Sequence, residues 1–169
     1  AYVPPPHEDM KELLGDWENF LHVRDAIPDL IQCAIMHEQF EAIHPFIDGN
    51  GRVGRLLITL FLVERERLTQ PLLYISDFIE QHRRDYYELL QQVRTTGDWD
   101  SWFFFFLQGV TDTARDAAQR AASLMEMREE YRRQLKGKAA AQRLLDALFE
   151  NPYVTAARAA TCWRTPTTT

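Results

Sequence analysis

The chain has 169 residues, of which 46% are hydrophobic and 26% charged, and its formal net charge is −6. This length and composition predict a soluble globular protein with one domain, or one domain and an appendage. The acidic balance argues against a surface that binds nucleic acid throughout, which would be basic. Cys33 and Cys162 form no CxxC pair, so neither a zinc site nor a disulfide framework is indicated, as suits a reducing cytoplasm.

No apolar run approaches the length of about 18 residues that spans a membrane, and no signal pattern opens the chain. We therefore expect a cytoplasmic protein without a membrane partner, and the small architecture suits a bacterial source. The chain starts at Ala1 in a stretch typical of a linker, which suggests a fragment or a processed chain. Residues 1–6 should be extended, because their three consecutive prolines fix φ and exclude a continuing helix.

Two helices are expected before residue 44. Apolar residues at three-and-four spacing predict an amphipathic helix from His7 to about His22. A largely buried helix should follow Pro28, which suits a first turn. His37 lies in it and is best interpreted as a packed or half-exposed residue. A zinc-protease motif is excluded because position 41 holds Glu41, not His.

The run from Ile43 to Leu57 differs from a packing pattern. Three glycines and an asparagine fall within six residues there, namely Gly49, Asn50, Gly51 and Gly54. Glycine permits the backbone geometry of a ligand-binding loop, so a loop is predicted over 44–51. A helix should then run from Gly51 or Arg52 to about Arg67. The free N–H groups at its start make an anion site, for which phosphate is the usual ligand.

Charged residues surround this predicted anion site. Arg52 and Arg55 are three residues apart, so both guanidinium groups can reach the same side of the loop. Asp48 offers one carboxylate, which fits Mg²⁺ carried in on a nucleotide. His44 can accept a proton near neutral pH.

A structural interpretation explains part of this run. Pro45 and Phe46 are most simply a turn and a core anchor. Core packing explains neither the three glycines around Asn50 nor two arginines at a helix start, for which no acidic partners are expected nearby.

Residues 44–55 read His-Pro-Phe-Ile-Asp-Gly-Asn-Gly-Arg-Val-Gly-Arg. This run resembles the signature of the Fic-domain family, His-Pro-Phe-x-(Asp/Glu)-Gly-Asn-Gly-Arg-x-x-Arg, at every fixed position. The resemblance implies an all-α Fic-type helical bundle with the Gly-rich loop between two central helices. It also implies a protein adenylyltransferase, which transfers AMP from ATP to a Ser, Thr or Tyr hydroxyl of a target protein.

The resemblance also implies a role for each site residue. His44 would deprotonate the target hydroxyl, and Asp48 would hold Mg²⁺ on the α- and β-phosphates. The anion hole would be formed by the segment from Gly49 to Gly51, with Gly54 also beside the nucleotide. Arg52 would hold the β-phosphate region and Arg55 the γ-phosphate.

A further helix is predicted from Ser76 or Asp77, either of which can cap it, to near Gly97. It carries the pair Tyr86 and Tyr87, whose plain interpretation is an amphipathic core position beside an exposed ring. Fic proteins commonly have a Tyr-Tyr pair at this distance, lining the adenosine pocket, and the resemblance assigns that role here.

The C-terminal half begins with a helix from Asp98, whose four consecutive phenylalanines indicate a core element, with a homodimer face as the alternative. This helix continues or restarts through residues 114–134. We expect a Fic domain over 1–135 and an appendage over 136–169. The appendage has a short helix, a turn and a second helix from Ala156 to about Cys162, capped by Thr155.

The appendage resembles the opening of a winged-helix module without its recognition helix and wing, so nucleic-acid binding is not expected of it. Its end, residues 165–169, is a low-complexity tail expected to be disordered.

Three alternatives stay open. The same site can remove AMP, or transfer another phosphate-bearing group, and a non-catalytic nucleotide-sensing module is the competing class. The inhibitory helix and the target-binding flap of many Fic proteins are not found in this sequence. We therefore expect an upstream inhibitory helix or an inhibitory partner to supply regulation.

Overall fold

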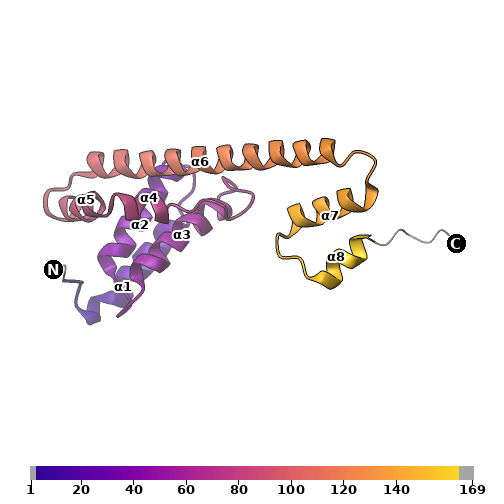
Figure 1. The fold of residues 1–169 in the computed structure, drawn as a ribbon. Coiled ribbons are helices and arrows are strands. Elements are labelled where there is room, and N and C mark those ends of the chain that lie inside the picture. Colours follow the sequence, from indigo (N-terminus) through magenta and orange to yellow (C-terminus); the bar gives the residue numbers. More distant parts are fainter. Residues whose placement is uncertain (1–2, 164–169) are drawn as a thin grey trace. The chain divides into compact units, whose positions relative to one another are not determined.

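The computed structural model describes residues 3–163, and Figure 1 shows the fold. Within these residues the secondary structure is entirely helical, as the sequence predicts. The helices are α1 (His7–Leu21), α2 (Asp29–Ile43), α3 (Asn50–Glu64), α4 (Ser76–Gln81), α5 (Arg83–Thr96), α6 (Trp99–Gln134), α7 (Ala139–Glu150) and α8 (Ala156–Trp163). No helix in the described part of the chain is long and apolar enough to cross a membrane.

The chain forms two compact units, residues 1–117 and 118–169. The boundary falls inside α6, whereas the sequence analysis places a division after residue 135, and that domain division stays a prediction. The expected extended entry is seen for residues 3–6, where Pro6 has φ −56° and ψ 147°.

Helix α2 is the centre of the first unit, because nine of its fifteen residues are buried. The fully enclosed ones include Cys33, Ala34, Met36 and His37. Two tryptophan side chains attach neighbouring helices to the α2 backbone. Trp17 of α1 donates its indole N–H to Met36 O at 2.9 Å, and Trp102 of α6 donates to Ala34 O at 3.0 Å.

The expected core role of the phenylalanine run in α6 is confirmed for part of it. Phe106 is buried and Phe103 and Phe105 pack partly against the core, but Phe104 is 74% exposed. Gly109 lets α6 approach α4, since a Cβ at Gly109 would lie 2.6 Å from the Phe78 ring. One ring of the run therefore faces solvent, and the other three contact the core.

His37 is fully buried, which the sequence analysis allowed as the packed alternative. Its Nε2 lies 3.0 Å from the Tyr86 hydroxyl, and its ring lies parallel to that of Trp102. Burial lowers the pKa of His37 to about 4, and the nearby charge of Arg55 acts in the same direction. The imidazole is therefore neutral near pH 7.

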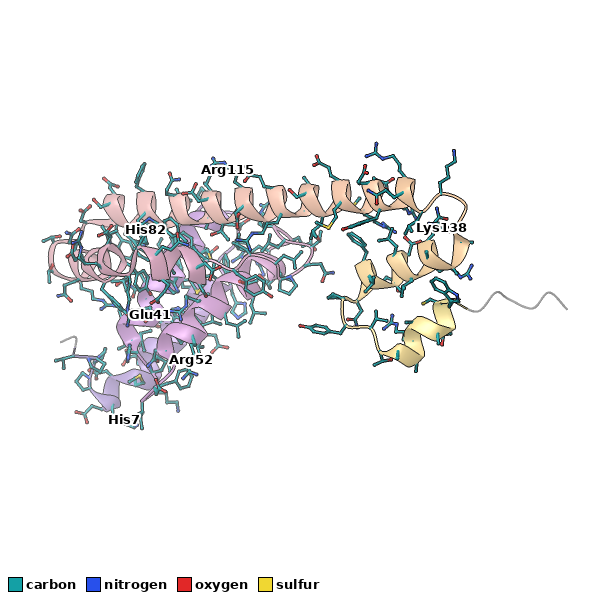
Figure 2. The ribbon with its side chains drawn as sticks, viewed as in Figure 1. His7, Glu41, Arg52, His82, Arg115 and Lys138 are labelled. Atoms are coloured by element: carbon teal, nitrogen blue, oxygen red, sulfur yellow. The ribbon has the colours of Figure 1, made fainter. Side chains whose placement is uncertain are left out.

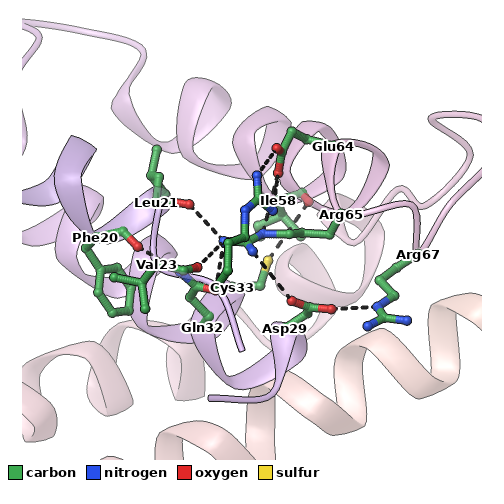
Figure 3. A network of polar contacts seen from close by, with 11 residues as sticks. Phe20, Leu21, Val23, Asp29, Gln32, Cys33, Ile58, Glu64, Arg65 and Arg67 are labelled. Atoms are coloured by element: carbon green, nitrogen blue, oxygen red, sulfur yellow. Dashed lines mark hydrogen bonds and ion pairs between the residues drawn. The ribbon is translucent and has the colours of Figure 1, made fainter. Parts of the chain in front are cut away.

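A buried arginine joins the ends of three segments, as Figure 3 shows. Arg65 follows α3, and its Nη2 donates to Leu21 O at 2.8 Å, Val23 O at 2.8 Å and Gln32 Oε1 at 2.9 Å. Its guanidinium also lies over the Phe61 ring. These bonds satisfy carbonyl groups at the turn between α1 and α2 that no helix ladder reaches.

Helix α3 begins at Asn50 and ends at Glu64, so the predicted end near Arg67 is three residues too late. The chain turns there because Glu66 adopts a left-handed conformation with φ 58°. The N–H groups of Arg67 and Leu68 then both donate to Leu62 O, which closes the helix end.

The single helix predicted from Ser76 or Asp77 to Gly97 is wrong, because α4 and α5 are separated at His82. The His82 backbone N–H donates to Phe78 O at 3.0 Å, and its ring Nδ1 lies 2.9 Å from the same oxygen. A side chain that shares the backbone acceptor competes with helix continuation. The predicted side-chain cap is also wrong, since α4 starts after Ile75 without one.

In the second unit, two ion pairs connect the end of α6 to α7. Asp146 of α7 accepts hydrogen bonds from Arg128 at 2.6 Å and Arg132 at 3.1 Å, and these arginines lower the pKa of its carboxyl group. Thr155 caps α8 as predicted, because its hydroxyl oxygen accepts a hydrogen bond from the Arg158 backbone N–H, with N and Oγ1 3.3 Å apart.

The predicted disordered tail lies outside the described residues. The winged-helix resemblance of the appendage stays a prediction.

We predict that Arg65→Ala lowers the free energy of unfolding by about 3 kcal/mol, because it removes the hydrogen bonds that a buried guanidinium donates to Leu21 O, Val23 O and Gln32 Oε1. Urea denaturation with circular dichroism measures this change. Arg67→Ala is the matched control, since that side chain is 65% exposed and forms an ion pair with Asp29. Its expected effect is below about 1 kcal/mol. Equal losses in both variants would contradict the structural role of Arg65.

We also predict a pH dependence of stability from His37. The unfolded chain binds a proton near the ordinary pKa of 6.5, whereas the folded chain resists protonation until about pH 4. The stabilising contribution of neutral His37 is therefore complete above pH 6.5 and is lost as the pH falls toward 4. Its full size is on the order of 3 kcal/mol.

Burial raises the pKa values of Glu38 and Glu41, so their contributions to the pH dependence of stability are opposite in sign to that of His37. The comparison of wild type with His37→Gln therefore isolates the contribution of His37. The difference in unfolding free energy between the two proteins should shrink as the pH falls from 6.5 to 4.5. His7→Gln, at an exposed position, should keep the wild-type profile. A constant difference for His37→Gln would refute the prediction.

Candidate functional site

His44 ends α2 in a left-handed conformation, with φ 52° and ψ 56°. Its backbone N–H still bonds Phe40 O at 3.0 Å, so the change of direction comes directly after the last helical bond. A non-glycine residue in this conformation is uncommon and often marks a functional position. The imidazole is half-buried at the mouth of the following loop.

Asn50 braces the loop from inside. It is 2% exposed, its Oδ1 accepts from the Phe46 N–H at 2.9 Å, and its Nδ2 donates to Phe46 O. These two bonds hold residues 46–50 in one tight turn. The nucleotide role assigned to Asn50 stays a prediction, and the visible role of its side chain is to shape the loop.

The loop turns into α3 at Gly49, which has φ +91°. A side chain at this backbone angle would be strained, so glycine is required here. Gly49 O accepts the Val53 N–H at 3.0 Å and starts the helix ladder. The N–H groups of the first turn, at Gly51 and Arg52, are thus at the positive end of α3, as an anion site requires.

Asp48 and Arg52 form an exposed ion pair across this helix start. The atoms Asp48 Oδ2 and Arg52 Nη2 are 3.1 Å apart, and the side chains are 89% and 74% exposed. Figure 2 labels Arg52 near the start of α3. Such a surface pair is weak, so both side chains can exchange partners with a ligand.

Asp48 fits Mg²⁺ only together with a nucleotide. Among the described residues no group of three potential metal ligands gathers anywhere. Mg²⁺ commonly takes one or two protein carboxylates and completes its shell with water and phosphate oxygens. The exposed carboxylate of Asp48 beside the anion site satisfies that requirement.

Arg55 is half-buried one turn into α3, near the carboxylate of Glu41. The expectation that the two arginines lack acidic partners is therefore wrong, because Arg52 pairs with Asp48 and Arg55 has Glu41 close by. Sequence spacing hid the second partner, which comes from α2. The available signal was an acidic residue, Glu41, three positions before His44 on a helix that was expected to be largely buried.

The expectation that Phe46 anchors the core is also wrong. Its side chain is 48% exposed, and Ile47 beside it is fully exposed. The two backbone bonds of Asn50 turn this part of the loop outward. Two apolar side chains therefore flank the candidate site on the solvent side.

The tyrosine pair lies on α5. Tyr86 is 2% exposed and Tyr87 is 55% exposed, with ring centroids 5.2 Å apart. Burial raises the pKa of Tyr86 well above its ordinary value, and its hydroxyl contacts His37. Tyr86 thus packs in the core and Tyr87 faces outward, as in the plain interpretation, while their assignment to an adenosine pocket stays a prediction.

Residues 1–62 match the model of the Fic/DOC family. The chain is similar to "Probable protein adenylyltransferase aq_aa38" of Aquifex aeolicus, with 43% identity over 63 residues, which are 37% of this chain and 20% of that protein. It is 32% identical over 138 residues to "Protein adenylyltransferase Fic" of Nematostella vectensis, covering 79% of this chain and 30% of that protein. The chain thus spans less than a third of the length of either relative.

A solved structure of a Fic family protein from Desulfovibrio desulfuricans has a similar fold. Its TM-score is 0.64 with 32% sequence identity, over 70% of this chain and 36% of that one. The all-α fold that the signature implied is therefore confirmed. Residues 1–62 thus resemble the Fic/DOC family domain, and the chain is similar to proteins named protein adenylyltransferases.

Proposed function

We propose that this chain transfers AMP from Mg-ATP to a Ser, Thr or Tyr hydroxyl of a target protein and releases pyrophosphate. The observation that carries the proposal is the loop between α2 and α3. It brings His44, Asp48, Arg52 and Arg55 around the positive end of one helix. The names of the homologous proteins favour the same reaction.

The first turn of α3 supplies the phosphate site. Its unbonded N–H groups and the helix dipole attract phosphate oxygens, and they are preorganised because Asn50 fixes the loop. Arg52 is exposed and can leave Asp48 for the β-phosphate region, while Arg55 binds the γ-phosphate from deeper in the helix. These contacts hold the leaving pyrophosphate.

His44 supplies the base. The target hydroxyl loses its proton to the imidazole as its oxygen attacks the α-phosphorus, and the bond between the α-phosphorus and the bridging oxygen breaks. The left-handed backbone of His44 directs the residue out of the helical path and toward the loop. Mg²⁺, held through Asp48 and the phosphates, would neutralise charge on the nucleotide. Positioning and charge neutralisation account for most of the expected acceleration.

Partners follow from the same site. The target presents its hydroxyl beside Phe46 and Ile47, the exposed apolar pair at the loop. An upstream inhibitory helix or a separate inhibitory protein controls the γ-phosphate position, and the protein acts in the cytoplasm.

We predict that His44→Ala lowers the rate of transfer by a factor of about 10² to 10⁴, because the general base is lost. The assay incubates the chain with Mg²⁺ and ATP labelled at the α-phosphate and measures label on the chain itself and on lysate proteins. Binding of Mg-ATP should change little. His22→Ala, at an exposed histidine of the first unit, is the control and should keep full activity.

Three outcomes would contradict the proposal. Unchanged transfer by His44→Ala would remove His44 as the base, and label retained only from γ-labelled ATP would indicate phosphate transfer. A wild-type chain that binds ATP without modifying any protein would favour the nucleotide-sensing alternative.

We predict that Asp48→Ala removes the Mg²⁺ dependence of transfer together with at least about 90% of the rate, since the only carboxylate of the loop is lost. A titration of activity against Mg²⁺ concentration tests this. Asp16→Ala removes an exposed carboxylate from α1 and should leave the titration unchanged. A normal Mg²⁺ titration for Asp48→Ala would show that the metal is held elsewhere.

A further inference from the structure

Glu41 lies in the last turn of α2 and is 6% exposed. Its Oε1 has no hydrogen-bond partner among the described residues. A buried carboxylate that lacks a donor is costly to the fold. Buried polar groups of this kind are rare, and each calls for a reason beyond packing.

The Glu41 carboxylate lies against the first turn of α3, where two glycines leave room for it. A Cβ at Gly54 would lie 2.5 Å from Glu41 Oε1, and a Cβ at Gly51 would lie 3.8 Å from the same oxygen. Alanine at Gly54 would therefore clash with the carboxylate. The glycines of the loop do more than turn the chain, because they admit an acidic group under the helix start.

Arg55 approaches the same place from α3. Its Nη1 lies 3.0 Å from the position of a Cβ at Gly51, the point that also lies 3.8 Å from Glu41 Oε1. The guanidinium and the carboxylate thus lie near each other beside one glycine, without a hydrogen bond between Arg55 and Glu41 Oε1. Figure 2 labels Glu41 on α2, which packs against α3.

Two of the residues around the Glu41 carboxylate belong to the candidate site. Arg55 and Arg94 are positive neighbours of the carboxylate, Glu38 is a negative one, and His44 also lies near it. Arg94 pairs with Glu38, with Nε and Oε1 3.2 Å apart. The other two neighbours, His44 and Arg55, belong to the candidate site.

We propose that Glu41 is a positioning residue for the candidate site, whose buried carboxylate attracts the Arg55 guanidinium and keeps it over Gly51 in the orientation that meets the terminal phosphate of ATP. The proposal rests on the proposed function for the identity of the ligand. The proximity of Glu41 and Arg55 does not depend on it. Glu41 acts on the nucleotide only through Arg55.

A positioning role and a purely electrostatic or inhibitory role predict opposite changes in ATP affinity when the charge of Glu41 is removed. A carboxylate near an anion site repels phosphate, so removal of its charge alone would strengthen ATP binding. If Glu41 positions Arg55, removal of the charge weakens binding, because the guanidinium loses its fixed counter-charge. The two roles therefore give opposite results for one substitution.

The test measures the dissociation constants of Mg-ATP and of AMP by calorimetry on the whole chain. Glu41→Gln should weaken Mg-ATP binding about tenfold and leave AMP, which lacks the terminal phosphate, unchanged. In an Arg55→Ala background, Glu41→Gln should have no further effect, since the two residues act as a unit. Glu38→Gln is the matched control, because it removes a buried carboxylate of α2 that pairs with Arg94 instead.

Unchanged or tighter Mg-ATP binding by Glu41→Gln would overturn the proposal, as would an equal loss in the Arg55→Ala background. Glu41→Met, of similar volume, replaces Glu41→Gln if circular dichroism shows that the amide disturbs the fold.

A second measurement needs no nucleotide. The side-chain Nε–Hε resonance of Arg55 in NMR spectra reports how firmly its guanidinium is held, and we expect it to broaden in Glu41→Gln but not in Glu38→Gln. If the wild type binds no Mg-ATP, the proposed function is wrong, and the Arg55 resonance alone then tests the positioning role of Glu41. An Arg55 signal equal in the wild type and Glu41→Gln would then overturn the positioning role.

Discussion

The burial of most of α2 is the constraint on which the first unit depends. Nine of its fifteen residues are buried, so its neighbours must supply most of its contacts, and they do so partly through its backbone. Trp17 and Trp102 donate to the carbonyl groups of Met36 and Ala34 from two other helices. Arg65 then ties the turn before α2 to the end of α3. The helix that carries His44 at its end is therefore held on several sides by directional bonds.

The packing of α2 and α3 also holds the candidate site in place. Helix α3 approaches α2 closely at Gly54, where a Cβ would lie 3.2 Å from both Phe40 and His37. The loop between the two helices is then short and braced by Asn50. Its reactive groups differ in freedom: Asp48 and Arg52 are exposed, whereas His44 and Arg55 are half-buried. Under the proposed function, the groups that exchange partners with a nucleotide are exposed, and the groups that hold a fixed orientation are packed.

A polar layer lies beneath this loop, within an otherwise apolar core. It contains neutral His37 with Tyr86, the ion pair of Glu38 and Arg94, and Glu41 below the start of α3. Such groups cost stability when they are unsatisfied, so their position under the loop links the core to the site. In this arrangement the packing of α2 sets the electrostatics of the residues that the signature places at the surface.

The sequence by itself determined the all-helical class, most helix ends, and the loop with its signature residues, because glycine spacing and apolar periodicity are local properties of the chain. It missed the break at His82, the outward turn of Phe46 and the approach of Glu41 to Arg55. Each of these depends on atoms that the sequence pattern does not relate: a ring that shares a carbonyl, an amide that bonds the loop backbone, and a carboxylate from another helix. Only the tertiary structure decided them, since long-range contacts and burial, unlike propensity, exist only once the helices are packed.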